Sequence, residues 1–153
     1  TDIQFVIIGD GRSKMNLIED IKNKNVSDMF LFISKQPSEK IPELMANCDV
    51  AFVSFTDNPL FSMTIPAKLQ SYMACGMPII ASATGETHKI ILESQSGYCS
   101  NPGDVDGLLK NIIELTKKTK IEMEQYSKNS RKYYEENFDK KALLDKMDKY
   151  FGG

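Results

Sequence analysis

Short apolar segments alternate with segments of helical spacing along the first two thirds of the chain. The apolar segments are bounded by turn residues, and they cover residues 3–8, 29–33, 49–54, 78–82 and 97–100. Segments of this length are typical of strands buried on both faces of a parallel sheet. Between them apolar residues recur at roughly helical spacing, as at Met15, Ile18 and Ile21. The pattern predicts an α/β fold with a doubly wound parallel sheet.

From about residue 117 the pattern becomes purely helical. Asp104 precedes an apolar helical stripe and is expected to cap that helix. Closing helices are then predicted over about 117–150, where lysines and arginines are interleaved with glutamates, as on a solvated helix face. No repeat or linker interrupts the chain, so residues 1–153 are expected to form one domain.

Composition and charge remove several classes of function. A net charge of −2 and a pI near 5.5 provide no positive field for nucleic acid. No apolar run approaches the length of a membrane helix, and no signal-peptide pattern is present, so we expect a cytoplasmic location. The three cysteines form no CxxC pair and there is a single histidine, His88, so no metal site is expected.

The most informative segment is Ile65–Ser82, which predicts a helix followed by a buried strand. Pro66 suits a first helical turn, and Gly76 suits the left-handed residue that ends a helix. Lys68 then lies in the first turn, where a cation opposes the helix dipole. That cost disappears if an anion is bound there, because free backbone N–H groups and a lysine together make a phosphate site. The alternative is a solvated lysine on an ordinary helix.

The position of this helix favours a phosphate-bearing ligand. In open parallel sheets, ligands bind beyond the carboxyl ends of the strands. The loops predicted at that edge cover residues 9–12, 34–37, 54–64 and 83–87. The helix that carries Lys68 begins immediately after the third of these loops.

Other motifs are weak. The Gly9-Asp10-Gly11 turn would need a further glycine where Lys14 stands to make a dinucleotide fingerprint, so a plain turn is favoured. A phosphate-binding Walker A sequence is missing, and His88 has no evident orienting acid, which argues against a hydrolase triad. Glu86 is either a carboxylate that complements a helix dipole or an acceptor for sugar hydroxyls.

Several segments together resemble the C-terminal domain of family 4 glycosyltransferases, which have the GT-B fold. The resemblance rests on IQFVIIGDG, NCDVAFVSF, IPAKLQSYMACGMPIIAS, SGYCSNPGDVDGLLKNI and the tail NFDKKALLDKMDKYF, and so runs along nearly the whole chain. The segments QPSEKIPEL and IPAKLQSYMACGMPII look closest to bacterial members that build surface polysaccharides, including acetamido-sugar transferases.

The resemblance implies the donor-binding half of a retaining transferase that uses a nucleotide-diphosphate sugar, here a UDP-sugar, without metal or cofactor. The diphosphate would face Lys68 and the amides of Thr64 and Ile65, and Phe32, Ile33 and Ser34 would border the base. The donor-binding residues expected from this resemblance are Gly11, Phe32, Ile33, Ser34, Ser62, Met63, Thr64, Ile65, Lys68, Ser71 and Glu86.

Two departures from the family matter. The family's E-x7-E pair is replaced by Met63 and Ser71, so its ribose and sugar contacts do not carry over. We hypothesise that Glu86 or Gln70 substitutes for them. The family's diphosphate-clamping Arg and Lys would lie upstream of residue 1, as would the acceptor domain. The catalytic residues therefore stay unknown, and we expect the isolated chain to be inactive.

The expected partners are the nucleotide sugar, the protein's own N-terminal domain and a glycan or lipid-linked acceptor. The full-length enzyme is expected to be cytoplasmic, with the option of a peripheral position at the inner face of the membrane. One alternative is a sugar-nucleotide epimerase, which would need acids or bases that the crevice loops lack. Another is a non-catalytic flavodoxin-like module. A receiver of that kind would want several acids after its first strand, where Asp10 stands alone.

Overall fold

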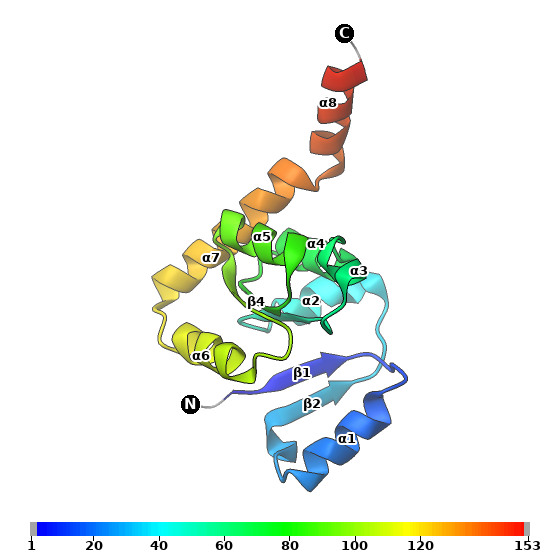
Figure 1. Cartoon of the computed structure of the whole chain (residues 1–153), viewed down its shortest axis with the longest axis vertical. Coiled ribbons are helices and arrows are strands. Elements are labelled where there is room, and N and C mark those ends of the chain that lie inside the picture. Colours follow the sequence, from blue (N-terminus) through cyan, green and yellow to red (C-terminus); the bar gives the residue numbers. More distant parts are fainter. Residues whose placement is uncertain (1–2, 152–153) are drawn as a thin grey trace. The chain divides into compact units, whose positions relative to one another are not determined.

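The computed structural model describes residues 3–151, apart from the side chains of residues 59, 141, 142, 145, 146, 150 and 151. The chain divides into two compact units, Thr1–Leu44 and Met45–Gly153. Each unit contains parallel strands with helical connections (Figure 1).

The first unit is built on a pair of parallel strands. Strands β1 (Phe5–Ile8) and β2 (Phe30–Ile33) pair along their full length, with Phe5 opposite Phe30 and Ile8 opposite Ile33. Helix α1 (Lys14–Asn23) and the 3₁₀ turn η1 (Ser27–Met29) connect them. The rings of Phe5 and Phe30 stack with centroids 5.1 Å apart, which supports the pairing. The 3₁₀ turn η2 (Ser38–Lys40) and helix α2 (Ile41–Met45) follow.

The second unit contains a three-stranded parallel sheet in the order β3-β4-β5. These strands are β3 (Ala51–Ser54), β4 (Ile79–Ser82) and β5 (Gly97–Ser100). Its helices are α3 (Pro59–Ser62), α4 (Ala67–Ala74), α5 (Gly85–Ser94), α6 (Val105–Thr116), α7 (Lys120–Asn137) and α8 (Lys140–Phe151).

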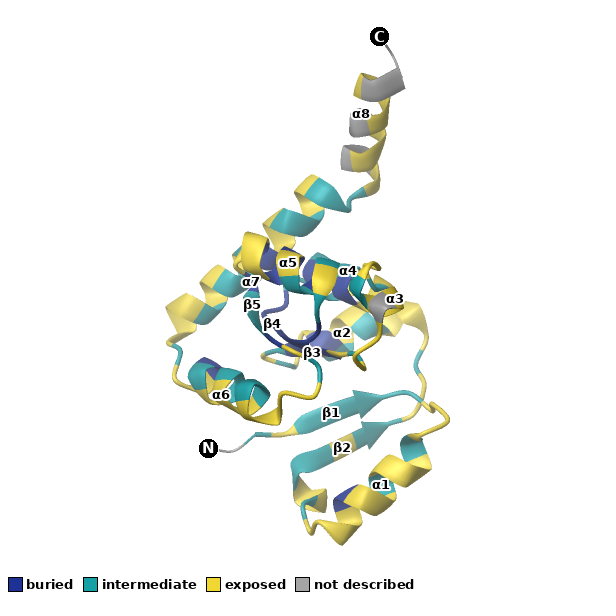
Figure 2. Cartoon of the chain, in the orientation of Figure 1, coloured by how far each residue is buried: buried dark blue, intermediate teal, exposed yellow. Residues whose placement is uncertain are grey.

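The core of the second unit lies between its sheet and the helices α4 and α5 (Figure 2). Ile79 and Ala81 alternate along β4 and so point to the same face, where they join Leu69 and Met73 of α4 and Ile91 of α5. Leu69 and Met73 are four residues apart and fully buried, so this face of α4 is fixed to the core. Helix α4 also packs against α7, while Lys68 and Ser71 are exposed.

The predicted α/β class with parallel strands is confirmed, and the strands fall in two sheets, one in each unit. Every predicted strand segment contains a strand of the structure. The predicted cap is also present, since the Asp104 carboxylate accepts a hydrogen bond of 2.9 Å from the Gly107 amide at the start of α6. The closing segment is helical as expected, in α7 and α8.

Two local details differ from the sequence expectation. Pro66 occupies the N-cap position before α4, with φ −70° and ψ 140°, and the helix begins at Ala67 rather than at the proline. The second is α3, which lies in a segment predicted as loop. A single turn is too short to show a helical periodicity, although Asn58 and Pro59 are a suitable N-cap and first residue.

Among residues 3–151, none of the helices has the length and apolar character needed to cross a membrane.

Candidate functional site

The amino end of α4 is an uncapped helix terminus. Pro66 provides no side-chain acceptor, and its carbonyl receives the amides of Leu69 and Gln70 at 3.0 and 3.4 Å. The backbone N–H groups of Ile65, Ala67 and Lys68 have no acceptor within the described residues. All three residues are exposed, so these groups are open to solvent or to a ligand. Unsatisfied amides at a helix start carry the positive end of the helix dipole.

Lys68 adds a full positive charge to this terminus. Its side chain is exposed, and no carboxylate of the described chain pairs with it. Ser71, three residues on, shares its face of α4, and the Ser71 hydroxyl donates a hydrogen bond of 3.0 Å to the Ala67 carbonyl. The exposed start of α4 can therefore receive an anion without first breaking an ion pair.

The segment before α4 is held in place by its own contacts. Phe55 packs against the core, and its ring stacks on Phe61 with centroids 5.5 Å apart. The Asn58 carboxamide oxygen accepts the Leu60 amide at 2.9 Å and so caps α3. These contacts fix the turn from which α4 starts.

Thr64 hydrogen-bonds within its own turn. Its amide donates to the Phe61 carbonyl at 3.4 Å, and its hydroxyl donates to the same oxygen at 3.3 Å. Of the two amides predicted to face a diphosphate, only that of Ile65 is therefore open. Ala67 and Lys68 provide open amides that the sequence prediction did not name, because the helix start lay one residue later than expected.

In the second unit, the backbone of loop 54–64 closely approaches the backbone of loop 83–87. Gly85 begins α5 with φ +64°, and a Cβ atom at this position would overlap the Ser62 carbonyl of α3. Only glycine allows both the left-handed backbone and this contact. Of the predicted site residues, Ser62 consequently lies beside the start of α5.

Glu86 follows Gly85 in the first turn of α5, which packs against α7. Burial of the Tyr133 phenol raises its pKa, and the negative charges of Glu93 and Glu86, with the hydrogen bond to Glu93, raise it further. The Tyr133 hydroxyl donates to Glu93 at 3.4 Å. The hypothesis that Glu86 replaces a sugar-binding glutamate stays a prediction.

The first unit brings together its own predicted residues. The Asp10 carboxylate accepts hydrogen bonds of 2.7 Å from the Lys14 ammonium and from the Lys35 amide, and these bonds lower its pKa. The turn after β1 is thereby tied to the loop after β2. Asp10 and Lys14 were not predicted site residues. Only the fold shows that they lie at the carboxyl end of the β1–β2 strand pair. The predicted residues gathered at the carboxyl end of this strand pair are Gly11, Phe32, Ile33 and Ser34.

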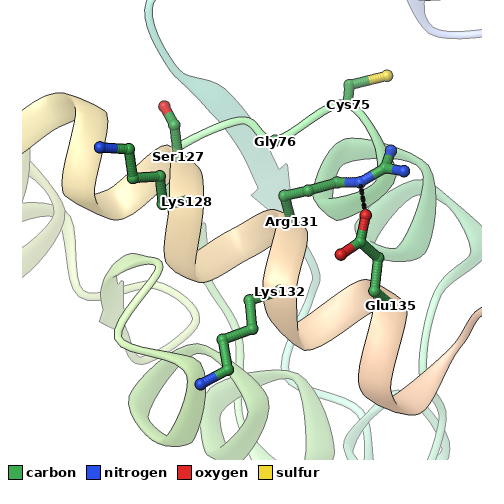
Figure 3. Close-up of a pocket in the computed structure, with 7 residues that line it drawn as sticks. All are labelled: Cys75, Gly76, Ser127, Lys128, Arg131, Lys132 and Glu135. Carbon is green, nitrogen blue, oxygen red and sulfur yellow. Dashed lines mark hydrogen bonds and ion pairs between the residues drawn. The ribbon is translucent and has the colours of Figure 1, made fainter.

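A separate groove of ≈ 420 Å³ lies at the other end of α4, against α7 (Figure 3). Arg131 donates to Glu135 and also to the Ala74 carbonyl, so it caps the carboxyl end of α4. Figure 3 shows Lys132 projecting away from Arg131. Arg131 of this groove is used to cap α4. The groove also lies about 12 Å along α4 from the open amides. It is therefore distinct from the candidate site.

Metal-binding clusters are missing from the described part of the chain, where no three His, Cys, Asp or Glu side chains gather in a suitable arrangement. The expectation of a metal-independent protein stays a prediction.

Comparison with known proteins places the chain in a family. Residues 1–133 match the family described as Glycosyl transferases group 1. The chain belongs to this family. It is 26% identical over 135 residues to the N-acetyl-alpha-D-glucosaminyl L-malate synthase of Bacillus anthracis, covering 88% of this chain and 34% of that protein. It is 22% identical over 111 residues to the 2-deoxystreptamine glucosyltransferase of Streptomyces kanamyceticus, covering 72% and 27%.

Solved glycosyltransferase structures share the fold. HepE of Anabaena, in complex with UDP-glucose, superposes with a TM-score of 0.73 at 21% identity, over 97% of this chain and 40% of that one. Sucrose-phosphate synthase of Thermosynechococcus elongatus gives a TM-score of 0.78 at 19% identity, over 97% and 37%. The predicted resemblance to the C-terminal domain of a GT-B glycosyltransferase is thus confirmed. The chain spans about a third of the length of the curated relatives named above.

Proposed function

We propose that this chain binds the nucleotide-diphosphate sugar of a glycosyltransferase, with UDP as the nucleotide. The observation that carries the proposal is the uncapped start of α4, with open amides at Ile65, Ala67 and Lys68 and the unpaired Lys68 ammonium. Family membership and the UDP-glucose complex of HepE support it.

The chemistry of this helix terminus suits a diphosphate leaving group. When the bond between the sugar and the diphosphate breaks, negative charge grows on the diphosphate oxygens. Amides that are already oriented by the helix, together with the Lys68 ammonium, stabilise that charge without reorganising. Hydrogen bonds of this charge-assisted type are roughly twice as strong as neutral ones. The role of α4 is therefore to lower the energy of the departing nucleoside diphosphate.

The remaining features of the proposal concern the whole protein. Gly11 and the residues Phe32, Ile33 and Ser34 of the first unit would border the nucleoside. The transferase would retain the anomeric configuration, need no metal and act on a glycan or lipid-linked acceptor in the cytoplasm, in surface-polysaccharide synthesis. The acceptor-binding domain and the diphosphate-clamping Arg and Lys would be supplied by another part of the protein, so the 153-residue chain should bind donor without transferring sugar.

An NMR titration tests the proposal. The isotope-labelled chain is titrated separately with UDP, ADP and GDP at up to millimolar concentration. We expect UDP to shift the amides of Ile65, Ala67 and Lys68 most strongly, and Lys68→Ala to weaken its binding about tenfold, the effect of losing one hydrogen bond to a charged group.

Lys89→Ala is the matched control, because Lys89 is also an exposed helical lysine of the second unit but lies on α5. UDP binding in this variant should equal that of the parent chain. The proposal is contradicted if all three nucleotides leave the start of α4 unshifted, or if both lysine variants weaken UDP equally.

A further inference from the structure

The surface beside the open amides of α4 is apolar. Leu60 is 61% exposed and Met63 is 70% exposed, and the side chains of Phe61 and Ile65 are also exposed. These four residues, which we call the apolar rim, come from α3 and the turn that leads to α4. They lie within eight residues of Lys68 on a segment held by the ring stack of Phe61 on Phe55. Exposed apolar residues gathered at a candidate site indicate contact with an apolar group.

Polar side chains at this position are largely engaged with the protein itself. Asn58 caps α3, the Thr64 hydroxyl donates to the Phe61 carbonyl, and the Ser71 hydroxyl donates to the Ala67 carbonyl. Asp57 at the start of this loop is followed by a stretch with no acidic residue from 58 to 71. The side chains of Leu60 and Met63 carry no hydrogen-bond acceptor for a hydroxyl. A sugar hydroxyl placed directly against these two side chains would therefore lose water without gaining a hydrogen bond from them.

We infer, building on the proposed function, that the donor sugar presents a methyl group to the apolar rim, either from an acetamido substituent or from a 6-deoxy carbon. The sugar is bonded directly to the diphosphate that the α4 amides would hold, so it must lie beside this end of the helix. A methyl group placed against Leu60 and Met63 buries apolar surface on both sides, whereas a hydroxyl in the same place does not. The rim thus selects the substrate class of the donor.

A binding series with one nucleotide tests this inference. The chain is titrated with UDP, UDP-glucose, UDP-N-acetylglucosamine and UDP-6-deoxyglucose, while the methyl resonance of Met63 and the amides of α4 are followed by NMR. At least one methyl-bearing donor should bind about fourfold tighter than UDP-glucose, the effect of burying one methyl group. The same donor should shift the Met63 methyl resonance, and the two donors distinguish the acetamido source from the deoxy source.

Glutamine variants of exposed apolar residues inside and outside the apolar rim test whether the preference depends on the rim. Met63→Gln and Leu60→Gln should each abolish the preference, measured as the affinity ratio to UDP-glucose within the same variant. Leu92→Gln should keep it, because Leu92 is also 61% exposed but lies in the third turn of α5.

Equal affinity for all three sugars, with UDP still shifting the start of α4, would overturn this inference and leave the proposed function standing. The same holds if Leu92→Gln removes the preference as fully as the rim variants do. Failure of UDP itself to shift α4 would overturn both.

Discussion

Helices α4 and α7 begin in opposite ways. At α7, the Thr119 hydroxyl accepts the Glu122 amide at 3.3 Å, and the Glu122 carboxylate accepts the Thr119 amide at 2.8 Å. This capping box satisfies the terminus and places a negative charge at the positive end of the dipole. At α4 no side chain of the described residues caps the helix, and Lys68 places a positive charge there.

Under the proposed function, the difference separates a helix start built for stability from one built for binding. A cap is worth about 1 kcal/mol, and the chain forms one at α7 and another at α6 through Asp104. At α4 that stabilisation is missing, and the first-turn lysine opposes the dipole. Anchoring by Leu69 and Met73, both fully buried, keeps the helix folded without a cap. The open amides are then available to an anion, which is what the proposed function requires.

The largest expected effect comes from Gly85→Ala, which removes the support of the α4 start. The left-handed backbone alone costs about 1–3 kcal/mol, and the new Cβ would also overlap the Ser62 carbonyl. We expect a clear loss of unfolding free energy in urea together with weaker UDP binding. Gly103→Ala is the control, since Gly103 has φ +78° but open space within 4 Å, so it should show the backbone cost alone. Equal losses in both variants would show that the Ser62 contact is unimportant.

An N-cap side chain at α4, like the one at α7, should weaken UDP binding and raise the unfolding free energy. Pro66 already has the extended backbone of an N-cap residue, so Pro66→Asp would place a carboxylate on the open amides. We expect UDP binding to weaken about tenfold or more, and the unfolding free energy to rise by up to about 1 kcal/mol. Isothermal titration and urea denaturation measure the two effects. Unchanged UDP affinity in a more stable variant would mean that these amides do not hold the diphosphate.

The reverse change at α7 should affect stability alone. Thr119→Ala removes one half of the capping box and should lower the unfolding free energy by about 1 kcal/mol. Affinity for UDP should stay at its parent value, because the start of α7 is not part of the proposed site. A fall in UDP affinity as large as that of Lys68→Ala would remove the functional distinction between the two helices.

The smallest expected effect is the pH dependence that Glu122 contributes at the start of α7. Hydrogen bonds from the Thr119 amide, the Thr119 hydroxyl and Lys118 lower the pKa of Glu122 to about 2, from its ordinary 4.5. Because the folded pKa is the lower one, this contribution to stability is complete above about pH 4.5 and is lost as the pH falls toward 2. Urea midpoints between pH 5 and 2.5 should therefore fall more in the parent chain than in Glu122→Gln. Identical slopes in the two proteins would contradict this.

Much of the fold could be predicted because its signals are local. Asp104 before an apolar stripe, and Gly76 before Pro78, mark helix ends through residues that are neighbours in sequence. Gly76 has φ +65°, as its predicted place at the end of α4 requires. Strand positions followed equally from continuous apolar runs such as Phe5–Ile8.

Features that depend on distant contacts could not be read from the sequence. The Gly85 approach to Ser62 joins residues 23 positions apart, and the Arg131 bond to the Ala74 carbonyl joins residues 57 apart. The engagement of the Thr64 amide depends on a single-turn helix that has no periodicity to detect. These contacts decide which amides at the α4 start are open, so the site could be located from the sequence but not its hydrogen-bonding groups.

The most direct test of the account compares both helix starts in one sample. In a two-dimensional amide spectrum of the chain titrated with UDP, the signals of Ile65, Ala67 and Lys68 report on α4, and those of Ile121 and Glu122 report on α7. We predict saturable shifts for the α4 signals and none for the α7 signals. Shifts of equal size at both helices, or shifts at α7 alone, would contradict the claim that α4 is left uncapped to hold a diphosphate.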